Sequence, residues 1–439
     1  MALQPCPGSA GVSPAPGSTN QYAHPQAHSP AIYETGAGET PALPGGLRFA
    51  QVTMQTRRLA SGALNGGLPT VASSGILPAQ HLQALIDEGR LFARQPILAS
   101  QVQPASLDLR LGPVAYRVRA SFLPSARSRV LDKVEQFQMH QLDLTTPAVL
   151  ERGCVYIVPL QEEVDLPADV SGLANPKSTV GRLDVFTRLI TDHGDEFERV
   201  PPGYQGQLYA EIAPRTFSVL VRQGTRMNQL RLARGKEETP HGVLSRLHEV
   251  ETLVYQGNGD PGEPKIADGL WFSVDLEGEP SVAVIGYRAK RYGPLVDLDR
   301  VDFYDPAEFW EPIPRPPRGQ LILNPEEFYI LASKEKIRIP PTYAAEMVGY
   351  DASVGEFRIH YAGFFDPGFG YGNDDLKGTR AVLEVRSHEV PFLLEDGQRV
   401  GRLVYERLLE APDRLYGTAI GSSYQGQGIA LSKQFKRGI

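Results

Sequence analysis

A short amphipathic helix is predicted near the start of the ordered part of the chain. Leu82, Leu85 and Ile86 recur at the spacing of one helix face. Pro78 suits the first turn of such a helix, and Gly89 suits its C-terminal end. We therefore expect order to begin close to Ile76.

The pattern then changes to short runs rich in Val, Ile, Tyr and Leu, which Gly and Pro separate. Residues 154–160 and 207–212 are two such runs. Runs of this kind are typical of β-strands. The pattern after the first helix predicts a mostly β fold, either a barrel or a sandwich.

Residues 1–75 show neither pattern and are rich in Pro, Gly, Ala, Ser and Thr. A segment with no apolar face to bury cannot offset the entropy lost on ordering. We expect a disordered leader here. Either the natural protein starts at Met54, or the whole leader is a genuine flexible tail.

An internal repeat of about 170 residues decides the expected domain organisation. The repeated pairs are 106–109 with 273–276, 166–167 with 339–340, 180–181 with 354–355, and Glu211 with Glu384. Their order and spacing agree, which favours a tandem duplication. We assign residues 76–235 to copy 1, 236–264 to a connector and 265–439 to copy 2, each copy being the size of one domain.

Composition excludes several classes of function. The net charge of -7 and the pI near 5.8 give no general attraction for nucleic acid. Cys6 and Cys154 are too few for a disulfide framework or a thiolate metal site. No stretch reaches the roughly 20 apolar residues that span a bilayer. We expect no nucleic-acid or membrane partner, and a cytoplasmic location.

One segment of copy 1 is suited to binding an anion. Lys177, Ser178, Thr179, Gly181 and Arg182 follow a β-like run. Hydroxyls, backbone N–H groups and a guanidinium group can converge on an oxyanion. An ordinary polar turn is the alternative reading. In copy 2, two of these positions are acidic, so we expect no anion there.

The complementary feature of copy 2 is an aromatic hairpin at residues 361–369, which contains Asp366 and precedes Glu384. A base needs an apolar face and a sugar hydroxyl needs an acceptor, so this segment suits a nucleoside. A β-turn with core aromatic residues is the alternative. Copy 1 has Pro201 in place of Asp366 but keeps Glu211.

Together these segments resemble the dCTP deaminase family, a branch of the trimeric dUTPase-like β-barrels. Residues 103–112 look like its early strand, 177–182 like its phosphate motif, 362–369 like its nucleoside hairpin and 424–428 like its C-terminal lid. The resemblance implies two tandem dUTPase-like distorted, jelly-roll-like β-barrels with a few short helices.

The resemblance also implies the chemistry, which is hydrolysis of dCTP to dUTP and ammonia, feeding dUMP and dTTP synthesis. Glu384 falls at the position of the family's catalytic glutamate, with Ser178 and Arg182 orienting water and carboxylate. The implied binding residues are Lys177, Thr179, Gly181, Ala362, Asp366, Tyr424 and Gln427.

The implied cofactor is Mg²⁺ bound through the substrate triphosphate. Zinc is not expected, because the H-x-E and P-C-x-x-C motifs of zinc deaminases do not occur in the chain. The implied partners are dCTP as substrate and dTTP as a feedback ligand. The chain is expected to act as a monomer or as a homo-oligomer, either a dimer or a trimer.

Each copy keeps the half-site that the other has lost. We therefore expect a composite site in which residues 177–182 of copy 1 face Asp366 and Glu384 of copy 2. The competing arrangement uses Glu211 as the base in a ring of copy 1 barrels. The competing functions are a dUTP pyrophosphatase, a bifunctional enzyme that also releases pyrophosphate, and a catalytically dead nucleotide-binding regulator.

Removing residues 1–53 should change neither the melting temperature nor the turnover of dCTP, because the leader offers no apolar face to bury. Thermal unfolding and steady-state kinetics of the shortened and full chains test this expectation. A clear drop in either quantity would mean that the leader packs against the folded part.

Overall fold

The computed structural model describes residues 73–235, 241–279, 283–348, 357–359, 363–371, 376–387, 389–417 and 428–437, with the backbone alone at 241 and 357–359. The expected leader therefore lies outside the described residues as far as residue 72, and so does Met54. Within the described part no helix is long and apolar enough to cross a membrane.

The helix expected near the start is confirmed as α1, Ala79–Asp87. Pro78 lies at its N-cap, just before the first turn, and Gly89 follows its end with a φ of 68°. Leu82 and Leu85 are buried. The other helices are short: η1 Ala99–Gln101, α2 Val130–Phe137, α3 Ser178–Gly181, α4 His241–Val250, α5 Pro306–Phe309 and η2 Pro317–Gly319.

The first half of the structure is built from antiparallel sheets. Its strands are β1 Gly75–Ile76, β2 Leu91–Ala93, β3 Leu107–Arg110, β4 Val114–Val118, β5 Gln138–Asp143, β6 Ala148–Leu150, β7 Val155–Asp165, β8 Val170–Pro176, β9 Val185–Thr191, β10 Arg199–Val200, β11 Gln205–Pro214, β12 Val219–Val221 and β13 Arg226–Arg234. One sheet has the order β1-β13-β8-β10, with β3 also paired to β13. The other runs β5-β4-β7-β11-β9, with β2 on β7. The runs at 154–160 and 207–212 are thus strands, as predicted.

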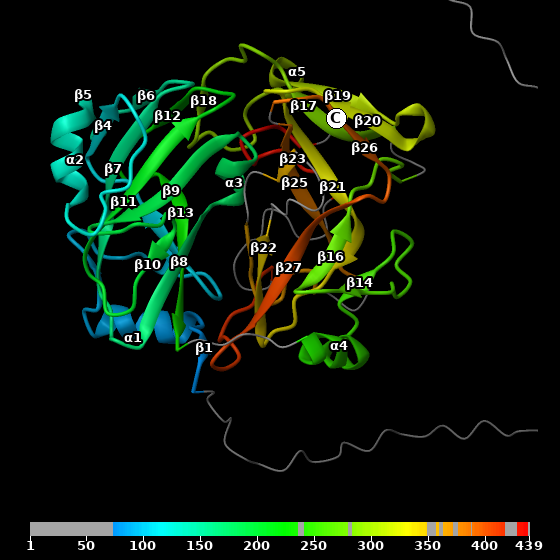
Figure 1. Cartoon of the computed structure of the whole chain (residues 1–439), viewed down its shortest axis with the longest axis horizontal. Helices are drawn as coiled ribbons and strands as arrows, with labels where there is room; N and C mark the ends of the chain where they lie inside the picture. The colour runs from blue at the N-terminus through cyan, green and yellow to red at the C-terminus, as the bar shows by residue number, and fades with distance from the viewer. Residues whose placement is uncertain are drawn as a thin grey trace, which may run out of the picture. The chain divides into compact units, whose positions relative to one another are not determined.

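The second half repeats this arrangement. Its strands are β14 Val254–Tyr255, β15 Lys265–Ile266, β16 Leu270–Ser273, β17 Val284–Ala289, β18 Val296–Asp297, β19 Trp310–Pro314, β20 Gln320–Leu323, β21 Phe328–Ile337, β22 Tyr343–Val348, β23 Phe357–Ile359, β24 Phe364–Phe365, β25 Thr379–Ser387, β26 Phe392–Glu395 and β27 Arg399–Arg407. The orders β15-β16-β27-β22-β24 and β19-β17-β21-β25-β23 match those of the first half. Strands β11 and β25 therefore occupy equivalent central positions, and the fold is mainly β, with a few short helices (Figure 1).

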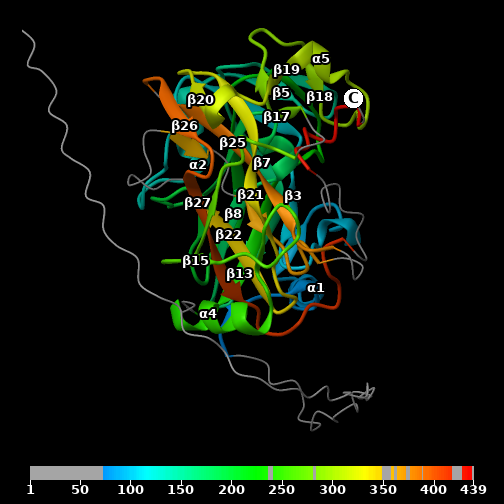
Figure 2. The ribbon, with the colours of Figure 1, turned by 90° about the vertical axis from the view of Figure 1, so that its right-hand side faces the viewer.

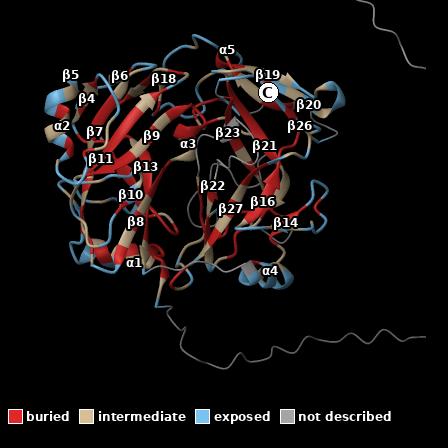
Figure 3. Cartoon of the chain, in the orientation of Figure 1, coloured by how far each residue is buried: buried red, intermediate tan, exposed pale blue. Residues whose placement is uncertain are grey.

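The two halves are joined by shared packing as well as by sequence. Strand β18 of the second half pairs in parallel with β12 of the first. One core cluster contains Phe217 from the first half together with Phe309, Trp310 and Phe435 from the second. The ring of Phe217 meets Trp310 edge-on at a centroid distance of 5.5 Å. Burial is concentrated in the central strands of both halves (Figure 3).

The expected connector at 236–264 contributes to the second core from residue 241 onward. Leu244 in α4 and Leu253 and Val254 near β14 are buried in the second cluster. Helices α1 and α4 lie at the same end of the sheets in both views (Figure 2). A charged composition that contains Gly and Pro suggested a connector, but these three apolar side chains anchor the segment.

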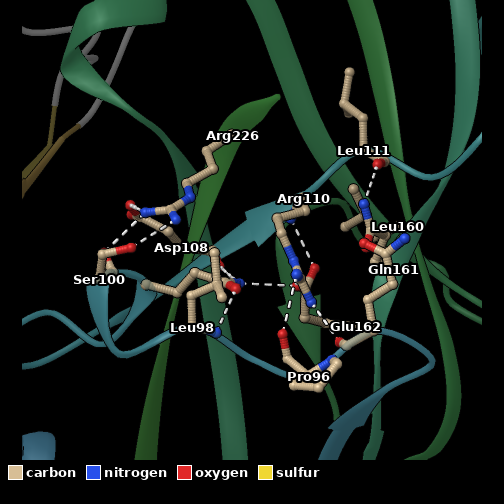
Figure 4. Close-up of polar contacts among 12 residues, drawn as sticks. Pro96, Leu98, Ser100, Asp108, Arg110, Leu111, Leu160, Gln161, Glu162 and Arg226 are labelled. Carbon is tan, nitrogen blue, oxygen red and sulfur yellow. Dashed lines mark hydrogen bonds and ion pairs between the residues drawn. The ribbon is translucent and has the colours of Figure 1, made fainter. Parts of the chain in front are cut away.

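A buried charge network fixes the early strand of the first half. Arg110 in β3 donates from Nε to Oε1 of Glu162 in β7 at 2.7 Å, and its backbone N–H donates to Oε2 at 2.7 Å (Figure 4). Gln101 donates to the same carboxylate at 2.9 Å. A buried charge is tolerated when it is paired and hydrogen-bonded in this way. The network sets the position of Asp108, two residues before Arg110.

Candidate active site

The anion-binding segment of the sequence forms a tight turn at the end of β8. Lys177 is the N-cap of the one-turn helix α3, and Arg182 is its C-cap. The Lys177 backbone N–H donates to the carbonyl of Met227 at 2.8 Å, which ties the turn to β13. Ser178 and Thr179 are partly exposed in α3, whereas Gly181 is buried. The turn therefore offers one cation, two hydroxyls and a guanidinium group along one short arc.

Lys177 is held by a carboxylate of the early strand. Its Nζ lies 2.5 Å from Oδ1 of Asp108, and Nη1 of Arg226 lies 3.6 Å from Oδ2 of the same side chain. Arg226 also donates to the carbonyl and hydroxyl of Ser100, at 2.8 Å each, as Figure 4 shows. Two cations around one buried carboxylate leave net positive charge beside the turn.

Arg182 faces a glutamate of the other half of the chain. Its Nε lies 3.9 Å from Oε1 of Glu384 in β25, and both side chains are buried. Arg182 also donates from Nη1 to the carbonyl of Ala430 in the C-terminal segment at 2.9 Å. The turn of the first half and the central strand of the second half thus meet at one point.

Glu384 is in an environment that favours its neutral form. Burial raises its pKa from 4.5 to about 7, while the positive charge of Arg182 acts in the opposite direction. A buried carboxyl resists ionisation because the charged form loses its hydration. A carboxyl group with a pKa near neutrality can both accept and donate a proton at physiological pH.

Asp366 lies at the end of β24, buried against a cation from the first half. Nη2 of Arg231 in β13 is 3.7 Å from its Oδ1, an atom that has no hydrogen-bond partner among the described residues. Burial raises the pKa of Asp366, and the charges of Arg231 and Lys177 oppose that rise. The influence of Lys177 indicates that the turn and the hairpin share one electrostatic environment.

Arg231 also fixes the backbone of that hairpin. It donates from Nη2 to the carbonyl of Phe365 at 3.3 Å and from Nη1 to that of Ala345 at 3.1 Å. Its guanidinium lies 3.9 Å from the centre of the Phe364 ring, a cation–π geometry. Only 1% of Arg231 is exposed. The position of Asp366 therefore depends on a side chain of the first half.

Glu211, the alternative base, has a different environment. It lies in β11 beside Arg188 of β9, which donates to its Oε1 from both Nε and Nη2. Arg188 in turn lies 3.5 Å from the centre of the Phe197 ring. This hydrogen-bonded pair joins two neighbouring strands of one sheet. The arrangement is that of a structural ion pair.

The structure thus brings Arg182 into contact with Glu384, places Lys177 near enough to Asp366 to act on its ionisation, and leaves Glu211 in a separate pair. Ala362, Tyr424 and Gln427 lie outside the described residues. The sequence reading missed Arg231 and gave no role to Asp108. The position of Arg231 between Leu230 and Leu232 was the available signal, because an arginine is rarely buried without a partner.

The C-terminal segment closes one side of this region. Ser432 donates from its hydroxyl to the carbonyl of Thr179 at 2.7 Å, and Ala430 receives the hydrogen bond from Arg182. A cavity of about 580 Å³ lies beside the segment, lined by Ala430 and Ser432 and by Tyr287 and Trp310 of the second half. The C-terminal segment therefore contacts the turn at residues 177–182 directly.

Comparisons with known proteins match both halves. The family described as 2'-deoxycytidine 5'-triphosphate deaminase N-terminal domain matches residues 73–236, and the corresponding C-terminal domain family matches 241–435. A "dCTP deaminase, dUMP-forming" of Beutenbergia cavernae is 32% identical over 152 residues, which are 33% of this chain and 74% of that protein. The chain belongs to the dCTP deaminase family.

Two further members of the family are similar over longer stretches. A dCTP deaminase of Natronomonas pharaonis is 31% identical over 209 residues, covering 46% of this chain and 99% of that protein. The crystal structure of 2'-deoxycytidine 5'-triphosphate deaminase from Agrobacterium tumefaciens is 52% identical, with a TM-score of 0.73, over 76% of this chain and 99% of that one. The likeness to dCTP deaminases thus extends across both halves.

The raised pKa of Glu384 predicts how stability depends on pH. A group whose pKa is higher in the folded state stabilises the fold below its unfolded value, and this contribution is lost as the pH rises through the folded value. Wild type should therefore lose about 3 kcal/mol relative to Glu384→Gln between pH 4.5 and pH 8, at about 1.4 kcal/mol per pKa unit. Denaturant unfolding at several pH values measures this difference.

Glu211→Gln is the matched control for this prediction. At pH 8 this variant should be less stable than wild type by about 1–3 kcal/mol, because it removes the negative charge that pairs with the guanidinium group of Arg188. At pH 8, a Glu384→Gln variant that is more stable than wild type and a Glu211→Gln variant that is less stable would support the two environments described. Equal destabilisation by both would contradict them.

Proposed function

We propose that this dCTP deaminase converts dCTP and water to dUTP and ammonia at one composite site, with Glu384 as its proton carrier. The observation that carries this proposal is the meeting of Arg182 and Glu384 in a buried contact between the halves. Around that contact lie a cationic turn and a hairpin acid. Lys177, Arg182, Asp366 and Glu384 supply separate functions for the phosphates, the sugar and the base.

Glu384 performs the proton transfers. Its carboxylate takes a proton from water, and the hydroxide adds to C4 of cytosine. The carboxyl then protonates N3. The proton of the new C4 hydroxyl passes through the same carboxylate to the exocyclic nitrogen, which leaves as ammonia. The pKa of about 7 supports this role, because a carrier must exchange its proton readily in both directions.

The remaining side chains orient the substrate. Arg182 and Ser178 hold the carboxyl and the water, with Arg182 favouring the charged form of Glu384. Asp366 accepts a hydrogen bond from a deoxyribose hydroxyl through Oδ1, which has no hydrogen-bond partner among the described residues. Lys177 and Thr179 contact phosphate oxygens, with the backbone of Gly181 close to them. Ala362, Tyr424 and Gln427 would complete the base contacts and the lid.

Mg²⁺ would be held by the triphosphate of the substrate. Lys177 and Asp108 fit such a complex, because the cation meets phosphate oxygens while the carboxylate tolerates a neighbouring metal charge. When bound, Mg²⁺ screens the phosphate charges. The protein side chains carry out the deamination, with no zinc required.

We further infer that each matched stretch is one dUTPase-like barrel of a duplicated chain. The repeated order of strands supports this reading. A chain that contributes both halves of the site needs no trimer to assemble it, so a monomer or dimer is sufficient. dTTP carries the same deoxyribose and triphosphate groups, and we propose it as a feedback ligand of the same site.

A second candidate is a bifunctional enzyme that also cleaves dUTP to dUMP. The "dUMP-forming" relatives favour it. Incubation with dCTP and Mg²⁺, followed by chromatography of the nucleotides, separates the two. The proposed reaction yields dUTP with equimolar ammonia and survives zinc chelation. Formation of dUMP and pyrophosphate would establish the second candidate, and activity restored only by zinc would overturn the metal-free mechanism.

Replacing the two candidate glutamates tests which half supplies the base. Glu384→Gln should lower turnover at saturating dCTP at least about a hundredfold, the usual effect of losing a general acid–base group. Glu211→Gln, compared at a temperature where it is folded, should stay within about tenfold of wild type. An active Glu384→Gln beside an inactive Glu211→Gln would assign the base to copy 1.

A further inference from the structure

A second charge pair crosses between the halves next to the catalytic contact, and nothing in the sequence motifs assigns it a role. Asp184 of the first half is fully buried, and Arg386 of the second half is 5% exposed. Arg386 donates from Nη2 to Oδ2 of Asp184 at 2.5 Å, and from Nε to Oδ1 at 3.3 Å and to Oδ2 at 3.1 Å. This bidentate geometry fixes both the distance and the angle between the two side chains.

Both members of the pair are held by further hydrogen bonds. Thr216 donates from its hydroxyl to Oδ2 of Asp184 at 2.5 Å. Arg386 donates from Nη1 to the carbonyl of Glu326 at 2.9 Å. The position of each charge is thus determined from its own half of the chain. The pair acts as a rigid connection rather than as a mobile surface contact.

The spacing along the chain links this pair to the catalytic contact. Asp184 follows Arg182 by two residues, and Arg386 follows Glu384 by two residues within β25. Alternate residues of a strand point to the same face, so Glu384 and Arg386 both point toward the first half. The charges alternate across the boundary, with Arg182 opposite Glu384 and Asp184 opposite Arg386.

The backbone at Asp184 suggests that this side chain is kept for a reason. Its φ is 56°, in the left-handed region that glycine adopts most easily. Aspartate and asparagine adopt this region more readily than other non-glycine residues, but it still costs them more than it costs glycine. Buried ion pairs also add little net stability over apolar packing. Both costs would be avoided by glycine at 184 and an apolar residue at 386.

We propose that Asp184 and Arg386 are positioning residues that set the distance between Arg182 and Glu384. Neither touches the reacting atoms in this assignment. The proposal rests on Glu384 being the proton carrier. Without the pair, the residues that follow α3 are no longer held at a fixed distance from β25. The 3.9 Å contact between Arg182 and Glu384 then lengthens and varies.

Loss of the Asp184–Arg386 pair should shift the pH dependence of the activity in one direction. Among the described residues, Arg182 is the charged group that acts on the ionisation of Glu384 and lowers its pKa, while Asp184 and Arg386 are the next charges along the boundary. When Arg182 is more distant, its positive charge opposes the effect of burial less strongly, so the pKa of Glu384 rises. The acid limb of the activity profile moves to higher pH as a result.

The double variant D184N/R386Q tests the proposal without leaving a buried charge unpaired. Asparagine tolerates the left-handed backbone at position 184. We expect kcat for dCTP to fall about tenfold or more, on the scale of small misplacements in an active site. KM should change by less than about threefold, because Lys177 and Asp366 keep their contacts. The acid limb of kcat should shift upward by about half a pH unit or more.

D275N/R380Q is the matched control. Asp275 and Arg380 form a buried pair inside the second half, with Arg380 on the same strand as Glu384. This variant measures the effect of losing a buried pair that does not join the halves. It should lower the melting temperature and leave the acid limb where wild type has it. The double variant D184G/R386M, which relieves the backbone strain and leaves no buried charge unpaired, should share the kinetic defect while folding stably.

Each outcome decides the matter. A normal kcat and pH profile in D184N/R386Q would overturn the positioning role, and so would the same shift in D275N/R380Q. Should D184N/R386Q fail to fold, D184G/R386M gives the same readouts. If wild type and Glu384→Gln turn over dCTP equally well, the proposed function has failed rather than this inference.

Discussion

The structure depends on a buried arginine of one half meeting a buried glutamate of the other. Neither Arg182 nor Glu384 would be stable in isolation at its depth, because an unpaired buried charge costs several kcal/mol. Their contact is long for an ion pair, at 3.9 Å, and it does not fully offset the burial of the carboxyl group. The protein thus keeps a carboxyl group poised between its two protonation states.

The two halves have kept the same sheet and given it different electrostatics. In β11, Glu211 pairs with the guanidinium group of Arg188 on the neighbouring strand. In β25, the equivalent Glu384 has, among the described residues, its cation across the boundary. One residue position therefore forms an ion pair within a sheet in the first half and a contact between the halves in the second. The difference lies in the neighbours and not in the glutamate.

The sequence predicted the features that local pattern determines. The first helix and the strand runs around Cys154 and Leu208 could be recognised from the sequence. So could the different half-site residues that each copy has lost. The meeting of the turn with Glu384 followed from those complementary losses. The segment after residue 241 was assigned to a connector, because its few apolar residues lie among charges and glycines; Leu253 is nevertheless buried.

The contacts that tie the halves together could not be predicted in the same way. Asp184 and Arg386 are 202 positions apart, and each alone is an unremarkable charged residue. Arg231 pairs with Asp366 through a fold that brings β13 against the hairpin. Such pairs depend on the relative placement of two sheets, which no periodicity within either one encodes.

The pairing of β18 with β12 has a consequence for synthesis of the chain. Val219 and Leu220 of the first half take Val296 and Asp297 as their neighbours on that side. While the ribosome is still making residues 222–295, the nascent first half carries an apolar strand edge without its cover. Open edges of this kind pair readily with other chains. The rate at which the next segment emerges therefore sets how long each newly made molecule is exposed to aggregation.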